Sequence, residues 1–120
     1  MNQPQIVLID IDEIDLSTAP AMDDLLRAAR EVSPLLVVDM SRVEFMSAEG
    51  IKTLMATRNW LAARAGRAVL AGCRRPVLRV LSITGMDTMI DCCYSTVDEA
   101  VQALVDRRHH RGPCAGNRTA

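Results

Sequence analysis

Aromatic residues and long apolar runs are scarce in this chain. Its 120 residues include one Phe, one Tyr and one Trp, although 49% are hydrophobic, so the core must be built from aliphatic and Met side chains. No apolar run reaches the ~18 residues that a membrane helix needs, and the N-terminus lacks the basic and apolar regions of a signal peptide. We therefore expect a cytoplasmic protein without direct membrane insertion.

Net charge and paired cysteine motifs are also missing. With 14 basic and 15 acidic residues the formal charge is −1, so the electrostatic attraction to nucleic acid is absent and we expect no DNA or RNA partner. The four cysteines lack the C-x-x-C pairs of a zinc site, which predicts free thiols; a strained disulfide between Cys92 and Cys93 is the less favoured alternative. We find no catalytic motif, and expect neither an enzyme nor a bound cofactor or metal.

Apolar patterning predicts an α/β domain. Buried runs predict four strands, around Ile6 and at Leu35–Met40, Ala68–Ala71 and Met89–Cys93. Helical stripes predict four helices, which end before Pro34, cover Ile51–Ala65, end before Gly85 and start after the capping box Thr96–Glu99. Alternating strands and helices form a mainly parallel, four-stranded sheet. We assign residues 1–106 to this single domain and predict a disordered tail at 107–120.

One segment joins a buried strand to a helix through a short loop, and its residues form a recognisable pattern. The pattern consists of Asp39-Met40-Ser41, Val43, Phe45-Met46 and Gly50-Ile51. It resembles the signature of the STAS domain, the family of bacterial anti-sigma-factor antagonists, which reads roughly Asp-Leu-Ser-x-Val-x-Phe-Met-Asp-Ser-Ser-Gly-Leu. The stretches Glu13–Pro20 and Leu81–Met86 are similar to two further family motifs.

The resemblance implies a STAS-like fold whose usual N-terminal edge strand is missing. Family members carry one more strand before the one that corresponds to Ile6. Only about five residues precede Ile6, too few for a strand and a turn of ordinary length. Either the edge is truncated or the true start lies upstream.

The sequence departs from the family pattern at its functional centre. Ser47, Ala48 and Glu49 stand where the family has Asp, the phosphorylated Ser and another Ser. Because Ala48 has no hydroxyl, the expected phosphoacceptor is absent. Ser47 is either a substitute acceptor or a helix N-cap, and we favour the cap. Glu49 either imitates a phosphate or only favours the helix N-terminus; since it carries one charge and phosphoserine nearly two, we favour the second interpretation.

By resemblance, the chain is a non-enzymatic regulator that binds an anti-sigma factor with a histidine-kinase-like ATPase fold and frees its sigma factor. The alternative is a scaffold subunit of a bacterial lipid-transport ATPase complex. Both loops of the implied surface follow parallel strands, so we expect them at one end of the sheet. Asp15 is equally well explained by an Asx turn. The partner-binding candidates are Asp15, Ser17, Thr18, Ser47, Ala48, Glu49, Gly50 and Lys52.

Gly50 has a cost that calls for an explanation. A glycine near a helix start destabilises the helix by roughly 1 kcal/mol relative to Ala. We expect close approach of another backbone to explain it. On that view Gly50→Trp weakens partner binding and leaves folding nearly intact.

Overall fold

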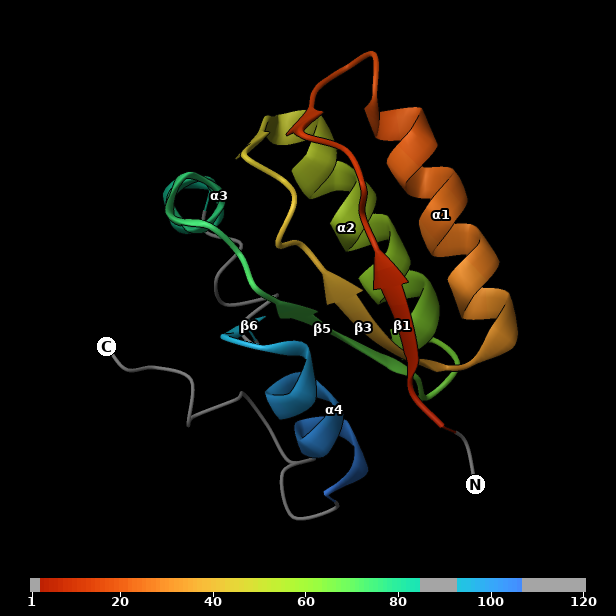
Figure 1. The fold of residues 1–120 in the computed structure, drawn as a ribbon. Helices are drawn as coiled ribbons and strands as arrows, with labels where there is room; N and C mark the ends of the chain where they lie inside the picture. Colours follow the sequence, from red (N-terminus) through yellow and green to blue (C-terminus); the bar gives the residue numbers. More distant parts are fainter. Residues whose placement is uncertain (1–2, 85–92, 107–120) are drawn as a thin grey trace.

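Figure 1 shows a parallel sheet between helices, in a computed structural model that describes residues 3–84 and 93–106. The main sheet has four parallel strands in the order β1-β3-β5-β6, which confirms the predicted fold class. These strands are β1 (Gln5–Leu8), β3 (Leu35–Asp39), β5 (Arg67–Ala71) and β6 (Cys93–Tyr94). The four helices are α1 (Ala19–Val32), α2 (Ala48–Ala62), α3 (Arg75–Ile83) and α4 (Val97–Val105).

The core has two parts because successive residues of a strand point to opposite faces. On one face α1 packs over β1 and α2 over β5, around buried side chains such as Met22, Leu26 and Leu61. On the other face α4 packs Ala100 and Leu104 against β3 and β5. The sheet is therefore covered on both sides, as the apolar strand runs predict.

The predicted cap of the last helix is confirmed. The Thr96 hydroxyl accepts the Glu99 N–H (3.1 Å), and the Glu99 carboxylate accepts the N–H of Ser95 (3.2 Å). At the start of α1 the prediction was wrong in its detail. Thr18 precedes the helix without a side-chain cap, because its hydroxyl donates instead to the Glu13 carbonyl (2.7 Å).

Helix α2 ends three residues before the predicted Ala65. Ala65 has a φ of 60° and donates to Ala62 (3.2 Å), while Gly66 donates to Leu61 (2.7 Å), which together form a Schellman ending. A Cβ on Gly66 would lie 2.5 Å from the Pro34 carbonyl oxygen. The glycine is therefore needed for this close approach, and alanine occupies the left-handed position.

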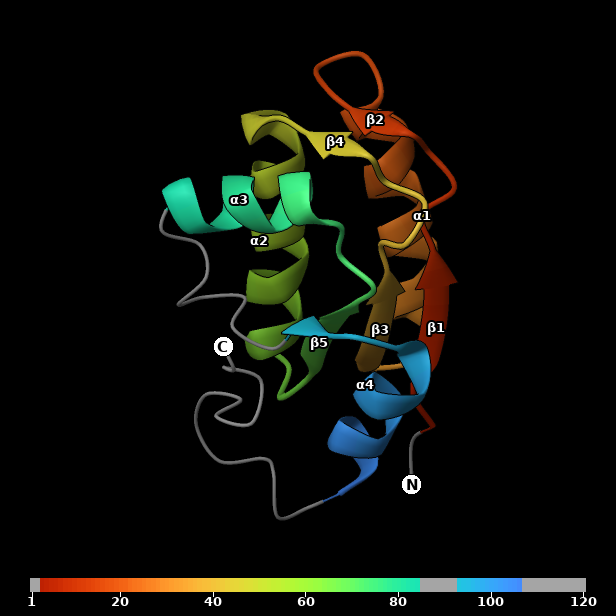
Figure 2. The ribbon, with the colours of Figure 1, turned by 60° about the vertical axis from the view of Figure 1, so that its left-hand side comes forward.

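A second, two-stranded parallel sheet was not predicted. Strand β2 (Glu13–Ile14) pairs with β4 (Phe45–Met46), with Glu13 opposite Phe45 and Ile14 opposite Met46. Figure 2 shows this small sheet beyond the ends of β1 and β3, beside the starts of α1 and α2. It sets the positions of both candidate loops.

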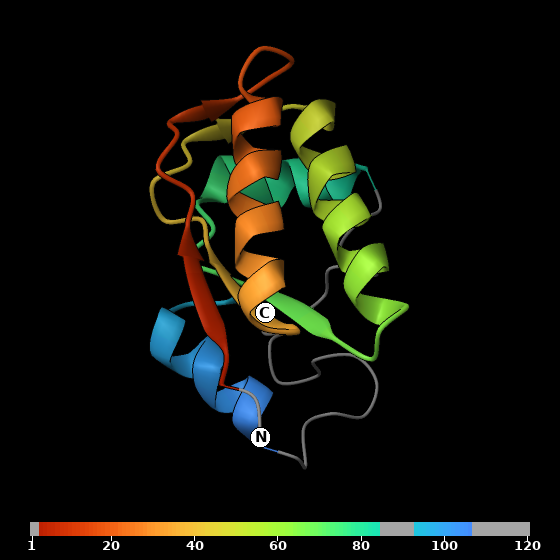
Figure 3. The same ribbon diagram turned by 90° about the vertical axis from the view of Figure 1, so that its right-hand side faces the viewer.

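Strand β1 lies at one edge of the main sheet (Figure 3), and within residues 3–84 and 93–106 no strand pairs with its outer side. This agrees with the expected absence of the usual edge strand. At the other edge β6 covers only Cys93–Tyr94; the rest of the predicted Met89–Cys93 strand, Gly85 and the tail 107–120 lie outside the described residues.

The two cysteines in the described ranges, Cys73 and Cys93, are free thiols as predicted. A hydrogen bond between their side chains, together with burial, raises the pKa of Cys73. The alternative disulfide involves Cys92, which is not among the described residues.

Candidate functional site

The two candidate loops lie side by side because β2 and β4 pair in register. The Ser47 N–H donates to the Ile14 carbonyl (2.8 Å), and the Glu44 N–H donates to the Asp12 carbonyl (2.6 Å). Residues 15–18 follow β2 and residues 47–52 follow β4, and we call these two segments the paired loops. The prediction that both follow parallel strands at one end of the domain is correct, but the strands belong to the small sheet.

Asp15 organises the first loop. Its Oδ1 accepts the Ser17 N–H (2.9 Å), the Ser17 hydroxyl (2.7 Å) and the Thr18 N–H (3.1 Å). Its own N–H donates to the Thr18 hydroxyl (2.9 Å). This is the predicted Asx turn, and it uses one carboxylate oxygen. No hydrogen bond within the described ranges uses Oδ2, so the turn and a contact with a partner are compatible.

These donors favour the charged carboxylate. The hydrogen bond from the Ser17 hydroxyl, followed by that from the Thr18 N–H, lowers the pKa of Asp15 below its ordinary value. A carboxyl group with a lowered folded-state pKa adds stability above its unfolded pKa of ~4, and this contribution is lost as the pH falls through the folded value. The turn should therefore loosen only in acid.

We predict that Asp15→Ala lowers the melting temperature at pH 7 and that the difference from the wild type narrows below pH ~4. Thermal unfolding followed by circular dichroism between pH 2 and 7 measures both. Asp12→Ala is the control, because Asp12 is exposed and its carboxylate makes no hydrogen bond within residues 3–84 and 93–106. A difference for Asp15→Ala that stays constant with pH would contradict the assignment.

The second loop leads into α2. Ser47 is the N-cap and its hydroxyl accepts the Glu49 N–H (3.3 Å), which confirms the favoured interpretation of this residue. Ala48 is the first residue of the helix, and it is exposed. Glu49 forms an ion pair with Lys52 (3.4 Å), so part of its charge is already compensated and it is a poor substitute for phosphate.

Gly50 is buried under the small sheet, and the interpretation of it as a surface residue was wrong. A Cβ at this position would lie 2.7 Å from the Met46 Sδ and 2.9 Å from the Ile14 Cγ2. Both of those side chains are fully buried. The close approach is therefore by side chains of β2 and β4 rather than by another backbone, and Gly50 supports the surface from below.

Sequence reasoning missed two exposed apolar side chains next to the loops. Leu16 lies in the first loop with 73% of its surface exposed, and Phe45 of β4 is 47% exposed. Apolar side chains of this size are usual in the centre of a binding surface. The signal was present in the alternation Ile14-Asp15-Leu16, where a buried residue is followed two positions later by one at a loop tip.

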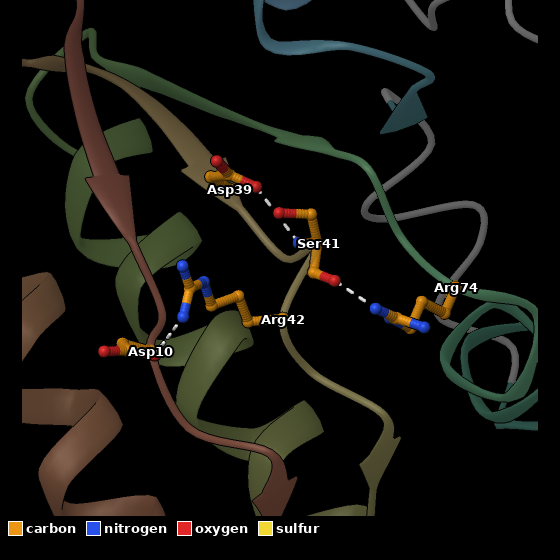
Figure 4. Close-up of polar contacts among 5 residues, drawn as sticks. All are labelled: Asp10, Asp39, Ser41, Arg42 and Arg74. Carbon is orange, nitrogen blue, oxygen red and sulfur yellow. Dashed lines mark hydrogen bonds and ion pairs between the residues drawn. The ribbon is translucent and has the colours of Figure 1, made fainter.

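The Asp39-Met40-Ser41 motif has a structural task in the next turn (Figure 4). The Ser41 N–H donates to the Asp39 carboxylate (3.0 Å), and Arg74 donates its Nε–H to the Ser41 carbonyl (2.8 Å). Arg42 pairs with Asp10 (3.2 Å). These contacts tie the segment between β3 and β4 to the ends of β1 and β5, and so fix the position of the second loop.

Taken together, the architecture is that of a small α/β domain with helices on both faces of a parallel sheet, whose exposed loops are set in place by a second sheet. The STAS domain model matches residues 2–100, and the chain therefore belongs to the STAS domain family. None of the helices in the described ranges is long and apolar enough to span a bilayer.

Solved structures agree with this assignment. An anti-sigma factor antagonist from Mycobacterium paratuberculosis is 30% identical, with a TM-score of 0.75 and 88% of this chain and 89% of that chain covered. The anti-sigma factor antagonist SpoIIAA, solved unphosphorylated, is 18% identical, with a TM-score of 0.70 and coverages of 88% and 90%. The STAS domain of a SulP transporter from Vibrio cholerae is 16% identical, with a TM-score of 0.67 and coverages of 91% and 86%. No curated protein matches the chain.

Proposed function

We propose that the protein is a cytoplasmic, non-enzymatic anti-sigma-factor antagonist that binds its partner through the paired loops. The partner is an anti-sigma factor with a histidine-kinase-like ATPase fold, and binding frees the sigma factor. The observation that carries the proposal is the convergence of Asp15, Ser17 and Thr18 with Ser47, Ala48, Glu49 and Lys52 on one exposed surface. Support comes from the 30% identity to an antagonist over nearly the whole chain.

The regulation of this antagonist differs from that implied by the family pattern. In that pattern a phosphoryl group on the loop serine adds nearly two negative charges and disrupts the complex. Here the corresponding side chain is the methyl group of Ala48, exposed at the first position of α2. Binding should therefore be insensitive to a kinase that requires a hydroxyl at this position, and Gly50 contributes only by supporting the loop.

The binding surface is tested with a bulky side chain at its centre. We expect Ala48→Trp to weaken the complex by more than tenfold, because the indole would hold the two surfaces apart where they need to be complementary. The partner is first captured from the native cytoplasm with the wild-type protein, and the variants are then compared by isothermal titration calorimetry.

Ala56→Trp is the matched control, since Ala56 is exposed on the same helix, eight residues further on. It should bind as the wild type does. Equal affinities for Ala48→Trp and wild type would remove the paired loops from the interface. Capture of a permease and an ATPase instead of an anti-sigma factor would favour the lipid-transport scaffold.

A further inference from the structure

The outer edge of β1 has backbone groups that point away from the sheet. Ile9 donates its N–H to the Asp39 carbonyl (3.1 Å), which extends the parallel ladder between β1 and β3. In a parallel ladder alternate residues turn both backbone groups to the same neighbour. Val7 and Ile9 therefore face β3, while the N–H and C=O of Ile6 and Leu8 point outward (Figure 3). An unpaired edge of this kind is a template for another strand.

The edge also lacks the features that usually protect it. Natural edge strands are blunted by charged side chains, but residues 5–9 carry no charge. The side chains of Ile6 and Leu8 are 47% and 40% exposed, on the face opposite to buried Val7 and Ile9. The edge therefore presents both unpaired backbone groups and apolar surface.

A stripe of exposed apolar residues on α1 lies beside this edge. Arg30 stacks on Trp60 of α2 (4.2 Å to the ring centroid), which identifies the flank of α1 that faces α2. At 100° per residue, the stripe lies on the opposite flank. Since α2 covers β5 and α1 covers β1, that flank faces beyond the sheet edge. The stripe consists of Ala21, Leu25, Ala28 and Val32.

We propose that a second copy of this chain occupies the edge, with the two β1 strands antiparallel about a two-fold axis at Val7. In this register Ile6 of each copy lies opposite Leu8 of the other. All outward N–H and C=O groups of Ile6 and Leu8 are then paired, and their four side chains form one apolar cluster. The two main sheets become one continuous sheet.

The sequence of β1 selects this register. Pairing about Ile6 would place Leu8 opposite Pro4, which has no N–H to donate. In the register about Val7, Asp10 faces Pro4, so no two acids of the strand meet. A shift by one residue is excluded because it would oppose side chains from different faces.

The same axis suits the α1 stripe. The Ser33 hydroxyl donates to the Gln3 carbonyl (2.7 Å), so the end of α1 is level with the start of β1. Val7 lies four residues further along the strand, ~13 Å, which corresponds to about nine helical residues back from Ser33. The axis therefore passes near Leu25. The two stripes would meet antiparallel, and the small Ala21 and Ala28 allow the helices to approach closely.

Sedimentation equilibrium between 10 µM and 1 mM, combined with amide hydrogen exchange, tests the proposal. We expect a weak, concentration-dependent dimer, because a short ladder and two helical stripes form a small interface. The amides of Ile6 and Leu8 should become protected as the dimer forms. Leu8→Pro should weaken the dimer at least tenfold without breaking the β1–β3 ladder, because an outward N–H is the one that an edge strand can lose.

Leu25→Asp should have a similar effect. Its control is Leu78→Asp, since Leu78 of α3 has a similar exposed fraction, 42% against 38% for Leu25. A monomer at every concentration overturns the proposal, including one whose Ile6 and Leu8 amides are protected throughout, which would place another segment of the chain on the edge. A dimer that survives Leu8→Pro, or one that leaves these two amides unprotected, overturns it as well.

Discussion

Gly50→Trp is expected to destabilise the protein by more than ~4 kcal/mol, a large share of the total stability of a small domain. The indole would have to enter the space between α2 and the small sheet, where even a Cβ lies 2.9 Å from the Ile14 Cγ2. Neither Ile14 nor Met46 can move to the surface, since both are fully buried. Urea denaturation at 25 °C measures the loss.

Ala48→Trp is the control for this result. It introduces the same side chain two residues earlier, at an exposed position, and should change the free energy of unfolding by no more than ~0.5 kcal/mol. If Gly50→Trp also cost less than ~1 kcal/mol, the packing of the small sheet on α2 would have to be revised.

Ala48→Ser should create the missing switch. With the captured anti-sigma factor and ATP, we expect phosphate on the new hydroxyl and a drop in affinity on the order of 100-fold, because a group with nearly two charges must be desolvated beside Glu49 and Asp15. Mass spectrometry locates the phosphate, and calorimetry compares the modified and unmodified forms.

The unsubstituted chain is the control for the switch, and it should stay unlabelled. Phosphate on Ser47 of that chain would show that the acceptor has moved by one residue, and the claim of an unregulated antagonist would then be withdrawn. Labelling of Ala48→Ser without release would separate modification from binding and contradict the proposed interface.

Local signals in the sequence predicted the helices and main strands well. The capping residues Ser47 and Thr96 are short-range features, and both caps are confirmed. Ala65 shows the limit of such signals. Glycine is the usual left-handed residue at a helix end, yet Gly66 is required by the Pro34 carbonyl, which comes from a distant part of the chain.

The candidate site was predicted in outline only. Family motifs located both loops, but the pairing of β2 with β4 involves two residues on each side, too few to leave a period in the sequence. The burial of Gly50 follows from that pairing and was missed with it. The role of Asp15 was predicted as one of two alternatives, because an Asx turn has a local signature and an exposed second oxygen has none.

The small sheet also has a consequence for the order of folding. Its strands are separated by α1 and β3, and parallel pairing over such a distance has to pay for loop closure before it gains its few contacts. We therefore expect β2 and β4 to join late, after α1, β1 and β3 have assembled. A nascent or partly folded chain would then lack the surface that its partner recognises, so that only completed molecules compete for the anti-sigma factor.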